Sequence, residues 1–288
     1  MDPLAGTMNW WQALVLGLVE GITEYLPVSS TGHLLLVQRL FHIGASEASE
    51  AFAICIQAGA ILAVLGLYRE RVWQMLRGFA GKDAAGLRLA LNVVAGFIPA
   101  VVLGLALEKP IKKYLFGEVF GLWPIVAAWF VGGVAILAVN IHRRRRQETG
   151  GTRQPIEGLT MPLAIIIGVS QCLAMWPGTS RSLVTIVAGI LVGLRLQAAV
   201  EFSFLLGVVT LTAATAHDGL KHGKEMLAAY GATDLAVGFI AAWLAAIVAV
   251  KWMVSYLSRH GLSIFGYYRV ALAIVVAALI LGGVLLHS

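Results

Sequence analysis

Two glutamates, Glu20 and Glu24, lie four residues apart in an apolar segment, shortly before Pro27. On a helix this spacing places both carboxylates on one face, where two like charges require a cation or a proton. Such a pair suits a divalent metal such as Mg²⁺ that also holds substrate phosphates, or a general acid and base. The alternative is a buried pair that is salt-bridged and serves stability alone.

Hydroxyl side chains follow directly after Pro27, at Ser29, Ser30 and Thr31. They predict a turn and N-cap that open a returning helix. The free N–H groups of a helix N-terminus bind anions, and the hydroxyls add further donors or a nucleophile. His33 lies close by and could act as a general base or acid, although a lone membrane histidine more often makes an interhelical hydrogen bond. We expect a phosphate-binding turn here, with His33 in a catalytic role.

A second segment, from Pro177 to Ser182, repeats this arrangement about 150 residues later and adds an arginine. The planar fork of Arg181 suits a phosphate or a carboxylate. Metal and arginine would neutralise a phosphate while a hydroxyl or a water attacks in line, which is phosphoryl transfer. The simpler alternative is that Arg181 only pairs with Glu20 or Glu201. The other residues expected to bind phosphate here are Gly178, Thr179, Ser180 and Ser182.

The two segments belong to a longer internal repeat. Glu20 aligns with Gln171 at an offset of 151 residues, and Pro27 aligns with Pro177 at an offset of 150. Polar, proline-broken segments at matching points of two hydrophobic halves indicate a binding site in the middle of a membrane. Because Gln171 replaces the carboxylate of Glu20, the repeat favours one active site. Glu201 is a weaker candidate for this site.

The composition sets the class of protein that must position these residues. Of 288 residues, 59% are hydrophobic and 12% are charged, and the mean hydropathy is +0.84. These values indicate an integral membrane protein that lies in a lipid bilayer. The net charge of +6 does not indicate nucleic-acid binding, because the basic residues lie at segment ends rather than on one face.

Six apolar segments are long enough to cross the membrane, and they lie near 50–68, 88–107, 118–141, 199–217, 235–255 and 267–286. The remaining apolar pieces, 9–25 with 32–43 and 160–176 with 181–196, are short and predict two re-entrant hairpins. Two kinked ordinary spans are the alternative. We therefore expect an all-α fold with an inverted-topology repeat, in which each half is a re-entrant hairpin followed by three transmembrane helices. The chain forms one membrane domain, with repeat 1 at about 9–141, a basic linker at 142–159 and repeat 2 at about 160–287.

Charge gives this scheme an orientation. On one side of the membrane, the predicted loops and helix ends carry fourteen Lys and Arg residues, in the regions 69–88, 142–159, 195 and 251–269. The opposite side carries six. The positive-inside rule makes the first side cytoplasmic, so both termini and the mouth of the first hairpin face outward. Only Arg181 is then left at membrane depth. Trp10, Trp11, Trp73 and Trp123 fall near the predicted interfaces as aromatic anchors.

These motifs resemble those of the BacA-type undecaprenyl-pyrophosphate phosphatases over essentially the whole chain. The family's E-x-x-x-E pattern matches Glu20 and Glu24, its PVSSTGH stretch matches 27–33, and its P-G-x-S-R-S-x-x-T pattern matches 177–185. The EFSFLL stretch that begins at Glu201 is also similar. Leu183 and Val209 depart from the family pattern and concern packing more than the reaction.

The resemblance implies an enzyme that hydrolyses undecaprenyl pyrophosphate to undecaprenyl phosphate and phosphate. That activity recycles the lipid carrier for peptidoglycan precursors and confers bacitracin resistance. The resemblance also implies a divalent cation, Mg²⁺ or Ca²⁺, and an active site on the outer side of the bacterial inner membrane. By the same resemblance Glu20, Glu24, Ser30, His33 and Arg181 form the reaction centre, and the motif leaves the nucleophile open. The sequence also leaves a homodimer open.

A secondary transporter or a flippase for polyprenyl phosphate or another anion is the competing hypothesis, because inverted repeats with paired hairpins are typical of transporters. A carrier for an anion needs hydrogen-bond donors but no pair of carboxylates. The combination of two glutamates with hydroxyls, His33 and Arg181 therefore favours an enzyme.

Overall fold

The computed structural model describes residues 8–44, 46–115, 121–148 and 153–284. Within these ranges the chain forms eleven α-helices and two short 3-10 helices, and the only β-type pairing is an isolated bridge between Gln154 and Leu194. The all-α expectation is confirmed. Some helical side chains fall outside the description, among them those at 50, 107–115, 144, 146 and 221–229, so the lysines expected at the less basic end are not placed.

Six long helices correspond to the six expected spans. They are α3 (Glu47–Leu67), α5 (Ala84–Leu115), α6 (Trp123–Glu148), α9 (Leu196–Ala229), α10 (Ala232–His260) and α11 (Ser263–Leu281). Five of them are long and apolar enough to cross a membrane, and α3 forms a sixth candidate together with the next helix, at a bend of 78°. The protein is therefore a multi-pass membrane protein. Helix α6 continues to Glu148, so the first part of the predicted linker is helical.

Helix α4 (Arg69–Phe79) replaces the loop expected after the first span. Its apolar residues Val72 and Met75 pack against the core, while Trp73 is exposed. Gly78 brings α4 against the backbone of Leu87 at the start of α5, where a side chain would collide. The apolar residues have helical spacing, but the segment also contains several charged residues. Its composition therefore led us to expect a loop.

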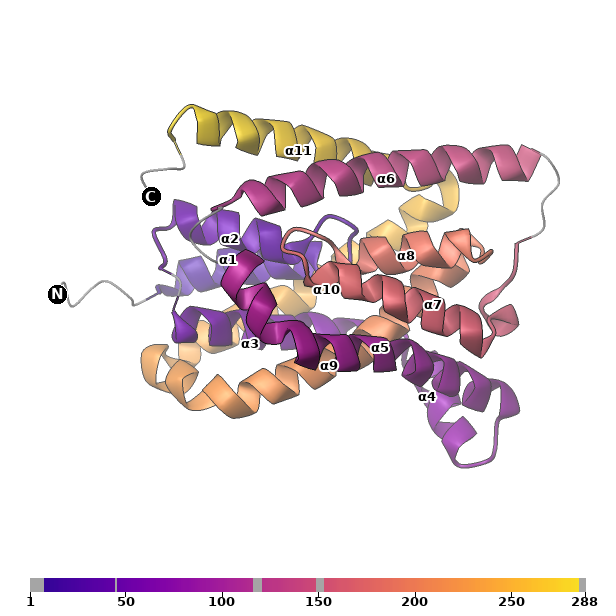
Figure 1. Cartoon of the computed structure of the whole chain (residues 1–288). Helices are drawn as coiled ribbons and strands as arrows, with labels where there is room; N and C mark the ends of the chain where they lie inside the picture. Colours follow the sequence, from indigo (N-terminus) through magenta and orange to yellow (C-terminus); the bar gives the residue numbers. More distant parts are fainter. Residues whose placement is uncertain (1–7, 45, 116–120, 149–152, 285–288) are drawn as a thin grey trace.

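Four short helices form two pairs. The first pair is α1 (Trp10–Thr23) with α2 (Ser30–Leu40), and the second is α7 (Met161–Gln171), extended by the 3-10 helix η2 (Cys172–Met175), with α8 (Arg181–Leu191). Helices of 11 to 14 residues span about 16–21 Å, too short for the roughly 30 Å of hydrocarbon. In Figure 1 the outer ends of α1 and α2 lie at the left with both termini, whereas those of α7 and α8 lie at the right. The connecting turns of the two pairs therefore meet inside the molecule.

Close helix packing depends on small residues. Gly17 and Gly21 of α1 lie against the backbone of Gly238 and Ala242 on α10, and Gly168 of α7 lies against the backbone of Gly96 on α5. Any side chain at these glycines would collide with main-chain atoms of the partner helix, which is the usual reason for small residues between membrane helices. The short helices are thus held directly on the long ones.

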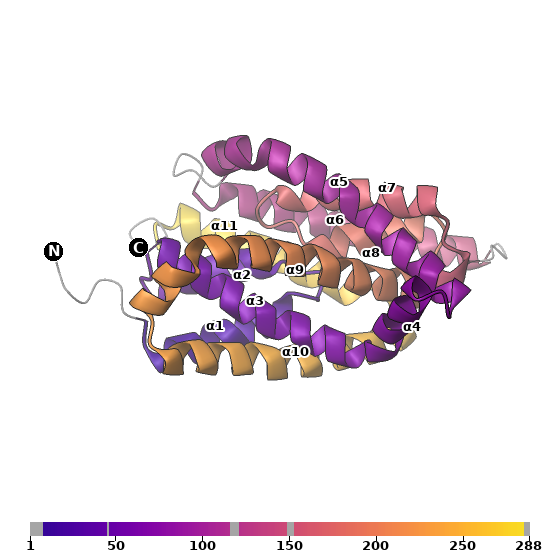
Figure 2. The ribbon, with the colours of Figure 1, turned by 90° about the horizontal axis from the view of Figure 1, so that it is seen from below.

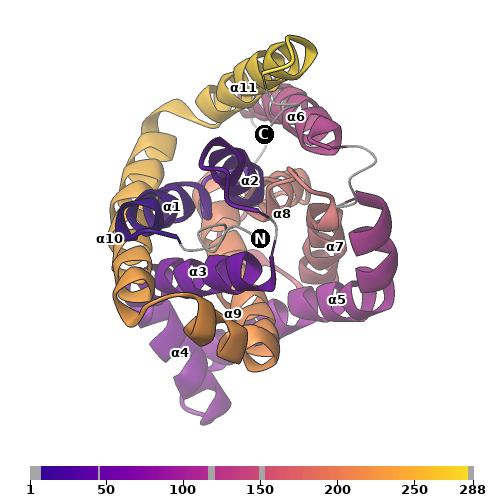
Figure 3. The same cartoon turned by 90° about the vertical axis from the view of Figure 1, so that its left-hand side faces the viewer.

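The long helices surround the two turns. Figure 2 shows α3 between α9 and α10 on the underside of the molecule. In the end-on view of Figure 3, α2 and α8 lie toward the middle, with α10, α9, α5, α6 and α11 around them. The irregular backbone between the short helices is therefore covered by protein, as backbone at membrane depth must be.

Candidate active site

The turns of the two helix pairs touch each other. We call residues 24–31 the first tip and residues 176–182 the second tip. Ser180 Oγ and Ser182 Oγ both donate hydrogen bonds to the carbonyl of Leu26, at 3.3 and 2.9 Å. This contact joins residues more than 150 positions apart, so the matching turns of the two halves lie side by side. It also means that these two hydroxyls, which we expected to bind phosphate, hold the tips together in this arrangement.

Glu24 joins both tips through its carboxylate. Oε2 accepts a hydrogen bond of 2.5 Å from the Ser30 hydroxyl, and Oε1 pairs with Arg181 Nη2 at 3.1 Å. The side chains of Glu24 and Arg181 are only 6% and 9% exposed. A charge-assisted bond at such a depth is stronger than one in water, and it fixes the position of all three groups. Glu24, Ser30 and Arg181, predicted in one site, are therefore in direct contact.

The guanidinium of Arg181 is enclosed on every side. Nη1 donates to the carbonyl of Ser203 at 3.3 Å, and the Tyr25 ring lies 5.4 Å below the guanidinium carbon. Gly207 on α9 leaves the space that the guanidinium fills, because a β carbon there would collide with it. Nε of Arg181 and the hydroxyl of Tyr25 are buried and have no hydrogen-bond partner within the described residues. They are unsatisfied polar groups beside the Glu24–Arg181 pair.

Glu20 lies one turn before Glu24 on the same helix face and is 1% exposed. Its Oε2 is buried and has no hydrogen-bond partner within the described residues. A carboxylate oxygen left unpaired at this depth is costly unless a cation or a proton offsets its charge. No group of three or more His, Cys, Asp or Glu side chains comes together within the described ranges. Two carboxylates with substrate phosphates are nevertheless the set that Mg²⁺ commonly uses, so Glu20 and Glu24 fit this cofactor.

His33 is held by two hydrogen bonds. Nδ1 lies 2.7 Å from the Ser29 carbonyl, and Nε2 lies 2.7 Å from the Tyr268 hydroxyl. Because a carbonyl only accepts, we assign the hydrogen of the neutral ring to Nδ1, so Nε2 accepts from Tyr268. The ring also packs between Trp129 and Tyr268, at centroid distances of 5.4 and 5.8 Å. His33 thus fixes the backbone of the first tip and makes no hydrogen bond with the Ser30 hydroxyl.

The backbone of the tips has a positive φ at two residues. Ser29 has a φ of 76° and Gly178 has a φ of 84°. The left-handed region suits Gly178, but it is costly for a serine and is found mostly at functional sites. Gly32 lies in α2, where a β carbon would collide with the Trp129 ring. Thr31 is exposed beside the first tip, and Thr179 is half-buried beside the second.

Arg269 is the main functional residue that sequence reasoning missed. It was counted with the basic residues at the cytoplasmic end, and that placement is wrong, because the side chain is 0% exposed inside the molecule. Its guanidinium donates to the carbonyls of Pro27 at 3.4 Å, Gly178 at 3.0 Å and Ala128 at 2.8 Å. Arg269 therefore joins both tips to α6. The sequence showed little sign of this role. The last span was expected to start near residue 267, which put Arg269 at a helix end, where a charge usually marks the membrane interface. In the structure α11 starts at Ser263, so Arg269 lies further inside the helix.

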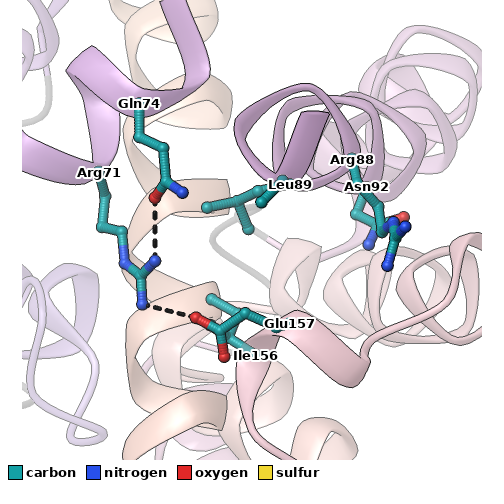
Figure 4. A pocket seen from close by; sticks show the side chains of 8 residues that line it. Arg71, Gln74, Arg88, Leu89, Asn92, Ile156 and Glu157 are labelled. Atoms are coloured by element: carbon teal, nitrogen blue, oxygen red, sulfur yellow. Dashed lines mark hydrogen bonds and ion pairs between the residues drawn. The ribbon is translucent and has the colours of Figure 1, made fainter. Parts of the chain in front are cut away.

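Glu201 lies outside the cluster at the tips. Its carboxylate pairs with Arg71 Nε at 2.5 Å, and Arg71 also binds Glu157 and Gln74. Figure 4 shows Arg71 between Gln74 and Glu157 at the mouth of a pocket near α4, with Arg88 and Asn92 across the opening. Backbone N–H donation and then Arg71 hold the pKa of the Glu157 carboxyl below its ordinary value. The simpler alternative of an Arg181–Glu201 pair is therefore wrong.

Comparisons with known proteins agree with these motifs. The family model described as Bacitracin resistance protein BacA matches residues 13–275. The chain is 45% identical over 271 residues to an undecaprenyl-diphosphatase of Sorangium cellulosum, which covers 93% of this chain and 86% of that protein. It is 40% identical over 259 residues to an undecaprenyl-diphosphatase of Bradyrhizobium diazoefficiens, covering 90% and 93%. It is also 42% identical over 267 residues to undecaprenyl-diphosphatase 2 of Rhodospirillum rubrum, covering 93% of each.

Proposed function

The chain belongs to the BacA family of bacitracin resistance proteins, and we propose that it is an undecaprenyl-diphosphate phosphatase whose reaction centre lies where the two tips meet. The enzyme hydrolyses undecaprenyl diphosphate to undecaprenyl phosphate and inorganic phosphate. This activity returns the lipid carrier to the synthesis of peptidoglycan precursors. It also accounts for the link to bacitracin resistance in the family name.

The single observation that carries the position of the reaction centre is the Ser30–Glu24–Arg181 contact across the two tips. Glu24 accepts the hydrogen of the Ser30 hydroxyl and can take the proton as the oxygen attacks. In this proposal Ser30 Oγ bonds to the terminal phosphorus, the bond from that phosphorus to the bridging oxygen breaks, and undecaprenyl phosphate leaves. Water then hydrolyses the phosphoserine. Arg181 offsets the negative charge on the transferred phosphoryl group.

We propose that a divalent cation, Mg²⁺ or Ca²⁺, is held by Glu20 and Glu24. Support comes from the unpaired, buried Oε2 of Glu20, one turn from the Glu24 carboxylate. When bound, the cation supplies positive charge for the diphosphate of the substrate. We expect the backbone N–H groups at the N-terminus of α2 and the Thr31 hydroxyl to donate hydrogen bonds to the same diphosphate.

We propose further that the two halves form an inverted repeat in the inner membrane, with the mouth of the first helix pair on the outer side. Support comes from the opposite directions of the two pairs in Figure 1 and from the basic residues near α4 and at the end of α10. A cysteine at exposed Gly44 should react with a membrane-impermeant maleimide in intact cells. A cysteine at exposed Lys82 should react only after lysis, and the reverse pattern would overturn the orientation.

Phosphate release tests the function directly. Purified protein in detergent should release phosphate from undecaprenyl diphosphate in the presence of Mg²⁺, and Glu24→Gln and Arg181→Ala should each lower this activity strongly while the fold stays intact. If the wild-type protein binds the lipid but releases no phosphate, the proposed function is wrong and a carrier for the lipid becomes the better hypothesis.

A further inference from the structure

An apolar groove of about 480 Å³ lies between α6 and the second helix pair. Val131, Gly132 and Ala135 line it on α6, and Leu183, Val187 and Leu191 line it on α8. We call it the α6–α8 groove. Val131 and Leu191 are strongly exposed, so the groove opens to the outside of the helix bundle along its length.

Small residues on α6 create the groove. Ala127, Ala128, Gly132 and Ala135 lie along one face of the helix, where larger side chains would fill the space. Between 127 and 135 the groove runs for about 12 Å, given the 1.5 Å rise per residue. That length is less than half of the roughly 30 Å of hydrocarbon in a membrane, so the groove can hold only part of a long chain.

One end of the groove reaches the second tip. Thr179 and Trp176 close this end, and the Trp176 indole is fixed by a hydrogen bond of 3.0 Å to the Pro124 carbonyl. Behind Gly132 lies the guanidinium of Arg269, 2.5 Å from where a β carbon would stand. Arg269 is fully buried, and its Nε has no hydrogen-bond partner within the described residues. The groove is therefore lined almost entirely by apolar side chains and reaches the second tip at Thr179, with the buried Arg269 behind its α6 wall.

We infer that the α6–α8 groove holds the isoprene units of the substrate that lie nearest to its diphosphate. A polyprenyl diphosphate has an anionic head followed by a long hydrocarbon chain of isoprene units, each with one methyl branch. The inference rests on the proposed function, since it assigns the tail of the same substrate. The groove continues the second tip through Thr179, so a head group at the tips places the first part of its chain at the groove entrance.

The groove orients the substrate more than it attracts it. A prenyl chain that moves from lipid into this groove leaves one hydrocarbon environment for another, so little hydrophobic free energy is gained. Packing along α8 does restrict the direction in which the chain leaves the diphosphate. Orientation of this kind aligns the terminal phosphorus with its nucleophile, and a small misplacement is costly.

A tryptophan in the groove tests the inference. We expect Ala135→Trp to lower kcat/KM for undecaprenyl diphosphate at least fivefold. The same variant should hydrolyse isopentenyl diphosphate, whose five carbons cannot reach position 135, at the wild-type rate. Val134→Trp is the matched control, because Val134 is exposed on α6 but does not line the groove. Equal effects of the two variants on undecaprenyl diphosphate, or none in either, would overturn the inference.

Photocrosslinking places the chain directly and does not depend on turnover. An undecaprenyl diphosphate analogue with a diazirine on its third isoprene unit should label groove residues such as Val131 and Val187, and excess undecaprenyl diphosphate should prevent the labelling. Labelling confined to other helix faces would overturn the inference, as would labelling that a phospholipid competes away equally well. Failure of the proposed function is a separate result, because the wild-type protein would then release no phosphate.

Discussion

Gly207 offers a way to displace Arg181 without removing its charge. A β carbon at position 207 would occupy the place of the Arg181 guanidinium, so Gly207→Ala must push this side chain away from Glu24. A hydrogen bond between charged groups contributes about 1.5–3 kcal/mol, and each 1.36 kcal/mol corresponds to tenfold in rate. If the lost interaction is needed in the transition state, kcat/KM for undecaprenyl diphosphate falls by about 10- to 150-fold.

The assay is phosphate release in detergent, with tryptophan fluorescence to follow unfolding. Gly219→Ala is the matched control on the same helix, because no atom of the described residues lies within 4 Å of a β carbon there. That control should keep wild-type activity and be as stable as the wild type or slightly more so, since alanine favours helix. The double variant Gly207→Ala with Arg181→Ala should be no less active than Arg181→Ala alone. A folded Gly207→Ala protein with activity within threefold of the wild type would refute the reasoning.

Further substitutions separate the roles of the other residues. Ser29→Gly should relieve the positive φ and stabilise the protein by about 1 kcal/mol, measured as a higher unfolding temperature. Glu20→Gln should raise the Mg²⁺ concentration needed for half-maximal phosphate release at least tenfold, and an unchanged metal requirement would argue against Glu20 as a ligand. Glu201→Gln should leave kcat/KM within threefold of the wild-type value, because Glu201 pairs with Arg71 outside the cluster at the tips. A large loss of activity would show that Glu201 belongs to the site. Arg269→Met should leave three carbonyls without this donor and lower the unfolding temperature. Unchanged stability would contradict the role of Arg269 in joining both tips to α6.

The fold could be read from the sequence because membrane depth imposes simple rules on length and hydropathy. The six long helices and the two short pairs follow from the count of apolar residues between prolines and charges. Helix α4 was missed because its apolar residues alternate with charged ones, so that hydropathy alone describes a loop. The extension of α6 to Glu148 was missed because a helix does not have to end where the apolar residues end.

The candidate site was predictable where polar side chains stand out within apolar segments. Glu20, Glu24, Ser30 and Arg181 were singled out for this reason, and the structure brings Glu24 into contact with Ser30 and Arg181. Arg269 was not found, because its three partners are main-chain carbonyls of distant segments, which carry no side-chain signal. The sequence also could not show that Glu24 rather than His33 holds the Ser30 hydroxyl. Such pairings are decided by the fold alone.

A double-mutant cycle on Glu24 and Arg181 tests most directly whether the two tips act as one reaction centre. The quantity is kcat/KM for undecaprenyl diphosphate in the wild type, Glu24→Gln, Arg181→Ala and the double variant. If the 3.1 Å pair works as a unit, the double variant is no more than about threefold worse than the poorer single variant, with a coupling of about 1.5 kcal/mol or more. If the two losses simply multiply, the tips act independently and the account is contradicted.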